Sequence, residues 1–174
     1  MRQQFFKITI VLAIAVLCFC VGCDKGPQKP KDMPDLFPCV ITITQGNVPL
    51  EGALVVLTPK SGVSNGWSTD GVTNAKGVVE LKTHGDFKGV PPGEFLVLVT
   101  KTELSPSDLG DIAPTDPVKY EEWHLGKLAE KRITYRLVKP EFGNAKTTPH
   151  SITISKESNK ATFDVGEPIK EEIK

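Results

Sequence analysis

Cysteine and histidine are the side chains of this chain with the widest chemical repertoire. The chain of 174 residues contains four cysteines and three histidines. Cys20 and Cys23 have the C-x-x-C spacing of redox pairs and of some metal sites. A redox pair of that kind needs a folded strand and helix around it, whereas these two cysteines directly follow an uncharged apolar run, residues 8–19 (ITIVLAIAVLCF). The context therefore argues against redox chemistry.

The histidines are the next candidates for chemistry. His84, His124 and His150 are too scattered for the ligand spacing of a zinc hydrolase. The sequence also lacks a Gly-Lys-Ser/Thr phosphate loop and a G-x-G-x-x-G dinucleotide motif. We therefore expect no enzyme, no metal site and no cofactor. A small envelope hydrolase stays an alternative only if His124 or His150 lies within hydrogen-bond reach of an acid in a pocket.

The first residues have the layout of an export signal. Arg2 and Lys7 give a cationic start, the uncharged run follows, and small residues lead to a cysteine. The run is shorter than the roughly 20 apolar residues that a membrane-spanning helix needs. We therefore expect residues 1–22 to be a signal peptide that is removed on export.

Cys20-Val21-Gly22-Cys23 resembles the lipobox of bacterial lipoproteins. The resemblance implies cleavage after Gly22 and lipidation of the Cys23 sulfur, with acyl chains such as palmitate as the anchor. Two or more chains hold a protein stably, because each buried methylene contributes about 0.8 kcal/mol. Leu is usual where this chain has Cys20, and Asp24 resembles the inner-membrane retention signal of some bacteria. The expected protein is lipid-anchored on the extracytoplasmic face, with the membrane as its partner through Cys23.

Charge and the remaining cysteine narrow the function further. Residues 1–22 carry two basic and no acidic residues, which leaves 19 basic against 21 acidic side chains. Such a balance gives no basic field for nucleic acid, so we expect no nucleic-acid partner. Cys39 would be the one free thiol of the processed chain, in an apolar strand pattern. A buried, inert thiol is the favoured interpretation, and intermolecular pairing and metal binding are the alternatives.

Composition divides the processed chain into three parts. Residues 23–36 are rich in proline and charge and predict a flexible tether. Residues 37–165 alternate short apolar runs with turn residues and predict an all-β, Ig-like or prealbumin-like sandwich of about seven strands. Residues 166–174 predict a charged, frayed tail.

The expected strands lie in alternating or apolar runs between turn residues, at 40–45, 53–58, 78–83, 94–101, 151–156 and 160–165. Residues 157–159 are expected to join the last two strands as a hairpin. Residues 102–139 break the pattern and predict a partly irregular or helical insertion. Within it, residues 118–131 predict a helical turn or two, interrupted by Gly126.

Three segments resemble the strand edges of the carboxypeptidase regulatory-like family. They are PLEGALV (49–55), TNAKGVVEL (73–81) and VPPGEFLVLV (90–99). The resemblance covers residues 37–101 and, further on, 140–165, and it implies a transthyretin-like β-sandwich found in exported bacterial proteins. In two-domain carboxypeptidases this module is an accessory without catalytic residues, so the resemblance implies a fold and no activity. Residues 102–139 have no counterpart and are where we expect any special function.

Loop aromatics are the candidate binding residues. Trp67, Tyr120, Trp123 and Tyr135 supply flat, stiff contact area, and His124 adjoins the densest group. We expect a non-catalytic envelope protein with a structural or protein-binding sandwich, or alternatively a carbohydrate-binding module. The binding hypotheses predict Trp67 or Trp123 facing solvent, and the structural hypothesis predicts both buried.

Neither a calcium site nor an isopeptide crosslink is expected. Asp70, Asn74 and Asp86 lie in glycine-rich loops, but calcium loops concentrate their ligands at every second position, so turn formation is the favoured role. Asp164 is placed to receive an isopeptide crosslink from a lysine on the first strand. Residues 38–59 contain no lysine, so that crosslink is not expected.

Overall fold

The structure is a computed structural model that describes residues 28–62, 66–106, 109–110 and 113–173. Lys31–Lys174 form one compact unit. The expected signal peptide, its cleavage after Gly22 and the lipidation site Cys23 lie outside the described residues. Among the described residues, no helix is long and apolar enough to cross a membrane.

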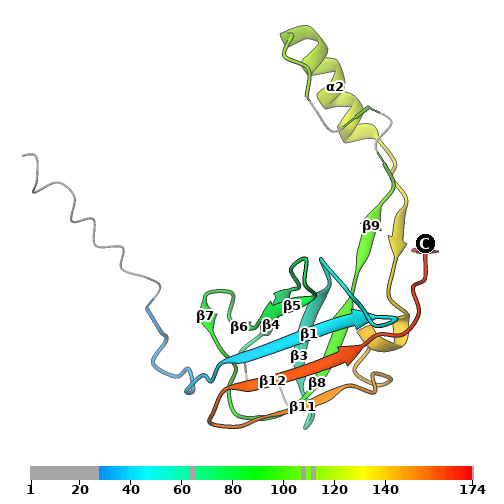
Figure 1. The fold of residues 1–174 in the computed structure, drawn as a ribbon. Coiled ribbons are helices and arrows are strands. Elements are labelled where there is room, and N and C mark those ends of the chain that lie inside the picture. The colour runs from blue at the N-terminus through cyan, green and yellow to red at the C-terminus, as the bar shows by residue number, and fades with distance from the viewer. Residues whose placement is uncertain (1–27, 63–65, 107–108, 111–112, 174) are drawn as a thin grey trace, which may run out of the picture. The chain divides into compact units, whose positions relative to one another are not determined.

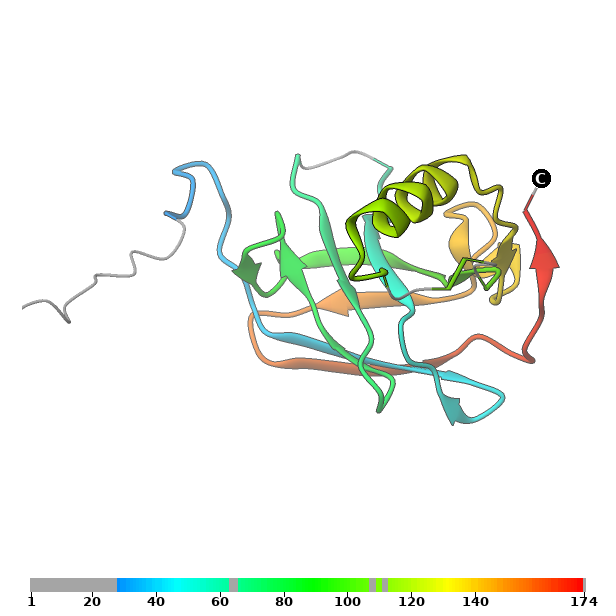
Figure 2. The same ribbon diagram turned by 90° about the horizontal axis from the view of Figure 1, so that it is seen from above.

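Lys31–Lys174 contain two sheets that pack face to face, as seen from two sides in Figure 1 and Figure 2. The four-stranded sheet has the order β12 (Asn159–Asp164), β1 (Cys39–Gln45) and β2 (Val48–Pro49), and β5 (Val78–Glu80) also pairs with β1. The six-stranded sheet has the order β11 (Ser151–Ile154), β8 (Gly93–Thr100), β3 (Leu54–Pro59), β4 (Thr69–Val72), β6 (Lys82–Thr83) and β7 (Phe87–Lys88). The prediction of an all-β sandwich is confirmed.

The core forms where the alternating strands turn their apolar faces toward each other. In β1, Cys39, Ile41 and Ile43 are buried while the residues between them are half-exposed, which is the period-two pattern of a strand with one inner face. The opposing sheet contributes the inner residues of β3 and β8, which are Val55, Leu57, Phe95, Val97 and Val99. Burial of these aliphatic side chains, at roughly 1.5–3 kcal/mol each, is the main force that holds the two sheets together.

The last two strands do not form the hairpin expected around residues 157–159. β11 pairs antiparallel with β8, whereas β12 pairs in parallel with β1 in the other sheet. Asn159 shapes the crossing, because its side-chain oxygen accepts from the Ser155 N–H (2.9 Å) and its amide donates to the Glu157 carbonyl (2.8 Å). The hairpin prediction was wrong because two alternating runs separated by a short turn fit an arch between sheets equally well.

Residues 78–83, expected as one strand, also divide between the sheets. β5 pairs with β1, and β6 pairs with β4. Leu81 lies between them, 1% exposed, with its N–H donating to the Cys39 carbonyl (3.0 Å) and its carbonyl accepting from the Gly89 N–H (3.0 Å). The chain therefore changes sheet at a buried leucine, which periodicity alone does not reveal.

The turn interpretation of Asn74 is confirmed. Its side-chain oxygen accepts from the N–H groups of Lys76 (2.9 Å) and Val78 (3.1 Å), and Gly77 has a positive φ of 70°. Asp70 lies in β4 and Asp86 in the turn between β6 and β7. In the described part of the chain, no group of three or more His, Cys, Asp or Glu side chains could hold a metal ion.

A third sheet is formed by three short strands that were not expected from the sequence. It has the order β13 (Glu171–Glu172), β10 (Thr134–Arg136) and β9 (Thr102–Leu104). The α-helix α2 (Pro117–Ala129) lies between β9 and β10 in the chain, so the predicted helical insertion is confirmed, and a short 3-10 helix, η2 (Pro140–Gly143), follows β10. Residues 166–174, expected to be a frayed tail, contribute β13, which pairs with β10. Within residues 23–36, expected to be a flexible tether, the Met33 side chain is buried, with 6% of its surface exposed.

Cys39 is a free thiol in the core. It is 2% exposed, and its burial raises the pKa of the thiol to about 11. The thiolate is the nucleophile and the metal ligand, so a thiol held protonated in an apolar core is inert. The interpretation of Cys39 as a buried thiol is confirmed, and its inertness stays a prediction.

Candidate binding surface on the helical arm

Residues 102–136, here called the arm, comprise β9, the segment that carries α2, and β10. The helix lies beyond the paired ends of β9 and β10, away from the two sheets of the sandwich (Figure 1). None of its residues is buried. The arm therefore presents side chains that the core does not need.

Local sequence explains where α2 begins and why it continues. The Asp116 side chain caps the helix by accepting from the N–H groups of Val118 (3.1 Å) and Lys119 (3.0 Å), and Pro117 occupies the first turn. The helix runs through Gly126, where an interruption was expected. A Cβ at Gly126 would lie only 2.7 Å from Leu109 Cδ1, so glycine is used here for close packing and not as a helix end.

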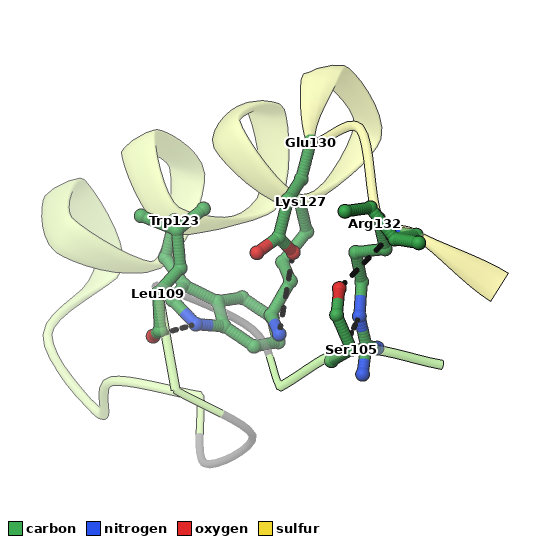
Figure 3. Close-up of polar contacts among 7 residues, drawn as sticks. Ser105, Leu109, Trp123, Lys127, Glu130 and Arg132 are labelled. Carbon is green, nitrogen blue, oxygen red and sulfur yellow. Dashed lines mark hydrogen bonds and ion pairs between the residues drawn. The ribbon is translucent and has the colours of Figure 1, made fainter. Parts of the chain in front are cut away.

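Trp123 fastens the helix to the loop before it. Its indole Nε1–H donates to the Leu109 carbonyl (3.0 Å), and Lys127 Nζ lies 5.5 Å from the ring centroid (Figure 3). Lys127 also pairs with Glu130 at 3.9 Å. Trp123 is consequently half-buried against its own arm.

Three hydrogen bonds that involve Ser105 hold the two chain segments together at the base of the arm. Arg132 Nε donates to the Ser105 carbonyl (2.7 Å), and the Ile133 N–H donates to Ser105 Oγ (3.1 Å). The Ser105 N–H donates in turn to the Ile133 carbonyl (2.7 Å). These bonds continue the β9–β10 ladder to the end of the helix.

The structure brings three of the predicted binding residues together. Tyr120, 44% exposed, stacks on His124 with ring centroids 5.9 Å apart and lies 6.0 Å from the Trp123 ring. Spacings of three and four residues place these rings on neighbouring turns of one helix. The other two aromatics are elsewhere: Trp67, half-exposed, packs edge-on to His84 at 5.8 Å, and Tyr135 on β10 lies under Lys170 Nζ at 4.6 Å.

Another side of the helix carries three exposed aliphatic side chains, with Glu121 among them. Val118, Leu125 and Leu128 are 69%, 57% and 73% exposed. Spacings of seven and three residues place them on one side of α2, and we call these three residues the outer face. These three residues were not among the binding residues expected from the sequence, although their spacing is visible there.

Neither remaining histidine candidate meets an acid. His150 Nε2 lies 2.9 Å from the main-chain oxygen of Asp164, and its ring packs against Phe142 (5.2 Å) and Phe163 (4.9 Å). Within the described residues, His124 and His150 form no hydrogen bond with a carboxylate. The condition set for a hydrolase is therefore not met at these two positions.

Residues 62–66 spell G-x-S-x-G, the nucleophile motif of many serine hydrolases, with Ser64 outside the described residues. The motif lies between β3 and β4, which are antiparallel neighbours in one sheet. A nucleophile elbow joins a strand to a helix and exposes the serine at the end of the strand. The setting of this motif is therefore not that of an elbow.

Asp164 is a structural carboxylate at the end of β12. Its Oδ2 accepts from Thr44 Oγ1 (2.7 Å) and from the Asn47 N–H (2.9 Å), and its Oδ1 accepts from the Gly166 N–H (2.8 Å). The Asn47 N–H and the Thr44 hydroxyl lower the pKa of this carboxyl from its usual value. On the facing strand the partner is a threonine, so the contact is a set of hydrogen bonds and not a crosslink.

No family model matches the chain, and no curated protein matches its sequence. Among solved structures, the major pilin subunit of Bacillus cereus aligns at 19% identity with a TM-score of 0.39, over 78% of this chain and 30% of that one. A candidate adhesin of Bacteroides ovatus aligns at 16% identity with a TM-score of 0.37, over 84% of this chain and 50% of that one. The chain thus spans half or less of each neighbour. The resemblance to the carboxypeptidase regulatory-like family stays a prediction.

Proposed function

We propose that this chain is a lipid-anchored extracytoplasmic protein whose sandwich is a non-catalytic support for a protein-binding arm. The observation that carries the proposal is the outer face, three large aliphatic side chains on a helix that buries nothing in the core. Exposed aliphatic residues grouped on one helix side are costly in water and are typical of surfaces that bind another protein.

The construction of the arm supports this role. Trp123 and Gly126 pack against Leu109 on the inner side of α2, so the helix is already folded before any partner arrives. A preformed helix binds without the entropy cost of ordering a loop, and the outer face is left free for the contact.

The anchor is tested separately from the arm. Intact mass and membrane fractionation of the expressed chain are compared with a Cys23→Ala variant. We expect the unmodified chain to gain acyl mass and to pellet with membranes, and the variant to do neither. If the unmodified chain and the Cys23→Ala variant fractionate alike and neither gains acyl mass, the proposal of a lipid anchor is refuted. The proposal for the arm would be unaffected by that result.

The arm is tested by placing a photoreactive amino acid at Leu125 or Leu128 in the living cell. A matched control carries the same group at Glu157, which is exposed in the crossing between β11 and β12. We expect a discrete crosslinked product at the two helix positions and none at the control. Identical patterns at all three positions would contradict a binding role for the outer face.

Carbohydrate binding through aromatics is the second candidate, and one observation favours it. Trp67 lines a shallow hollow of about 410 Å³ together with Val56 and Pro59 of β3 and with residues between β3 and β4. A half-exposed indole beside an open hollow is suited to stacking on a sugar ring. Quenching of indole fluorescence by neutral oligosaccharides, lost in Trp67→Ala and kept in Trp123→Ala, would identify this site.

A further inference from the structure

A second hollow lies where the sandwich meets the three-stranded sheet, at the base of the arm. It has a volume of about 310 Å³ and is lined by residues at the end of β8, on β9 and β10, around η2 and near β13. The lining residues are Thr100, Lys101, Thr102, Arg136, Val138, Lys139, Pro140, Gly143 and Ile173. We call it the basic hollow, because three of its side chains are cationic and none is acidic.

The three cations come from three separate segments. Lys101 joins β8 to β9, Arg136 is the last residue of β10, and Lys139 immediately precedes η2. Among the described residues, neither lysine ammonium forms an ion pair or a hydrogen bond. Arg136 meets Glu171 at 3.8 Å, a loose contact that leaves guanidinium donors for another acceptor. The two lysine charges have no acidic partner, and an anion placed between the three cations relieves their mutual repulsion.

The rest of the lining matches a ligand that is more than a bare ion. Thr100 and Thr102 contribute hydroxyls that donate and accept hydrogen bonds. Val138, 1% exposed, Pro140 and Ile173 give an apolar wall. A volume of about 310 Å³ lies at the small end of ligand sites, near the size of one sugar ring.

We propose that the basic hollow binds a monosaccharide-sized ligand through its carboxylate or phosphate group. Arg136 holds two oxygens of the anion through its planar fork, and the two lysines add charge from the flanks. The threonine hydroxyls bond the ring hydroxyls, and the apolar wall packs against a face of the ring. This inference depends neither on the lipid anchor nor on the outer face of α2.

The test is a titration of the isotope-labelled chain followed by amide chemical shifts at constant ionic strength. The probes are glucuronate, glucose 6-phosphate and neutral glucose. The test variant is Lys101→Gln/Lys139→Gln, which removes two charges without removing a contact. The matched control is Lys82→Gln/Lys160→Gln, which removes two exposed lysine charges from β6 and β12.

We expect saturable shifts around residues 100–102 and 136–143 with at least one anionic sugar and much weaker ones with glucose. The test variant should bind at least about tenfold more weakly, equivalent to roughly 1.4 kcal/mol, and the control should bind unchanged. Binding of glucuronate alone or of glucose 6-phosphate alone assigns the carboxylate or the phosphate class. Equal shifts with glucose, equal losses in both variants, or no saturable shift would overturn the proposal.

Discussion

Trp123→Ala should melt the helix of the arm while leaving the sandwich intact. The indole holds α2 by its hydrogen bond to Leu109 and by the cation that Lys127 places over its ring. Its removal takes away every contact of the indole with the loop. The helix would then depend on its own propensity.

The magnitude follows from the contacts. The hydrogen bond contributes about 1 kcal/mol, the exposed cation–π contact about 0.5–1 kcal/mol, and partial burial of the indole about 2 kcal/mol. The helix has 13 residues, a length at which an isolated helix is marginal in water, and Gly126 costs about another 1 kcal/mol relative to alanine. Loss of about 3.5–4 kcal/mol therefore makes the unfolded arm the major state.

The assay combines far-ultraviolet circular dichroism, amide hydrogen exchange and urea unfolding. We expect loss of helical signal and of exchange protection at residues 120–129. The global free energy of unfolding should change by less than about 0.5 kcal/mol, because α2 contributes no buried residue to the core. Leu128→Ala, which changes a residue 73% exposed, is the control and should keep the helix.

Two results would refute this reasoning. Persistence of the protected helix in Trp123→Ala would mean that contacts other than the indole hold it. A large fall in global stability would mean that the arm and the sandwich unfold together, and that the arm is not a separate element.

Three further predictions concern the sandwich. Thr73→Val keeps the shape of a side chain that is 3% exposed but removes its hydroxyl, which donates to the Leu50 carbonyl (2.6 Å) and accepts from the Ala53 N–H (2.9 Å). Urea unfolding should show that the free energy of unfolding falls by about 2–4 kcal/mol. An unchanged free energy of unfolding would show that water replaces these hydrogen bonds. Asp164→Asn should lose stability at neutral pH. Because the folded pKa of Asp164 is lowered, its contribution is full above the unfolded value and is lost as the pH falls through the folded value; the gap between variant and parent should therefore close in acid, and a gap that persists there would contradict the assignment. The folded pKa of Cys39 is raised to about 11, so its contribution to stability is full below the unfolded pKa and is lost as the pH rises toward 11. Native protein should resist thiol reagents at neutral pH until urea exposes the buried thiol. Rapid labelling of the folded protein would show that the core opens locally.

The sheet architecture was predictable wherever one strand carried one clear alternation. β1 and β8 each bury every second residue, and both were found within one residue of their observed ends. The pairing of those strands was less predictable. The register of residues 159–164 on β1 depends on contacts some 120 positions away, to which local periodicity is blind.

The part of the candidate site that depends on local spacing along one helix was also predictable. Tyr120, Trp123 and His124 group together because helical spacing guarantees it once α2 forms. The basic hollow was not predictable, since Lys101 and Lys139 are 38 positions apart and meet only through the pairing of β9 with β10. The three-residue strands that bring them together are too short to leave a periodic signal.

The parallel pairing of β1 with β12 also sets when this domain can close. Cys39 is registered with Asn159 and Thr44 with Asp164, so the first core strand lacks its neighbour on one side until nearly the whole chain is present. A chain that emerges from its N-terminus first, whether from a ribosome or across a membrane, therefore carries an open strand edge until residue 164 has appeared. The sandwich is complete only once β12 is present, and a chain cut before Asn159 cannot form the β1–β12 pairing.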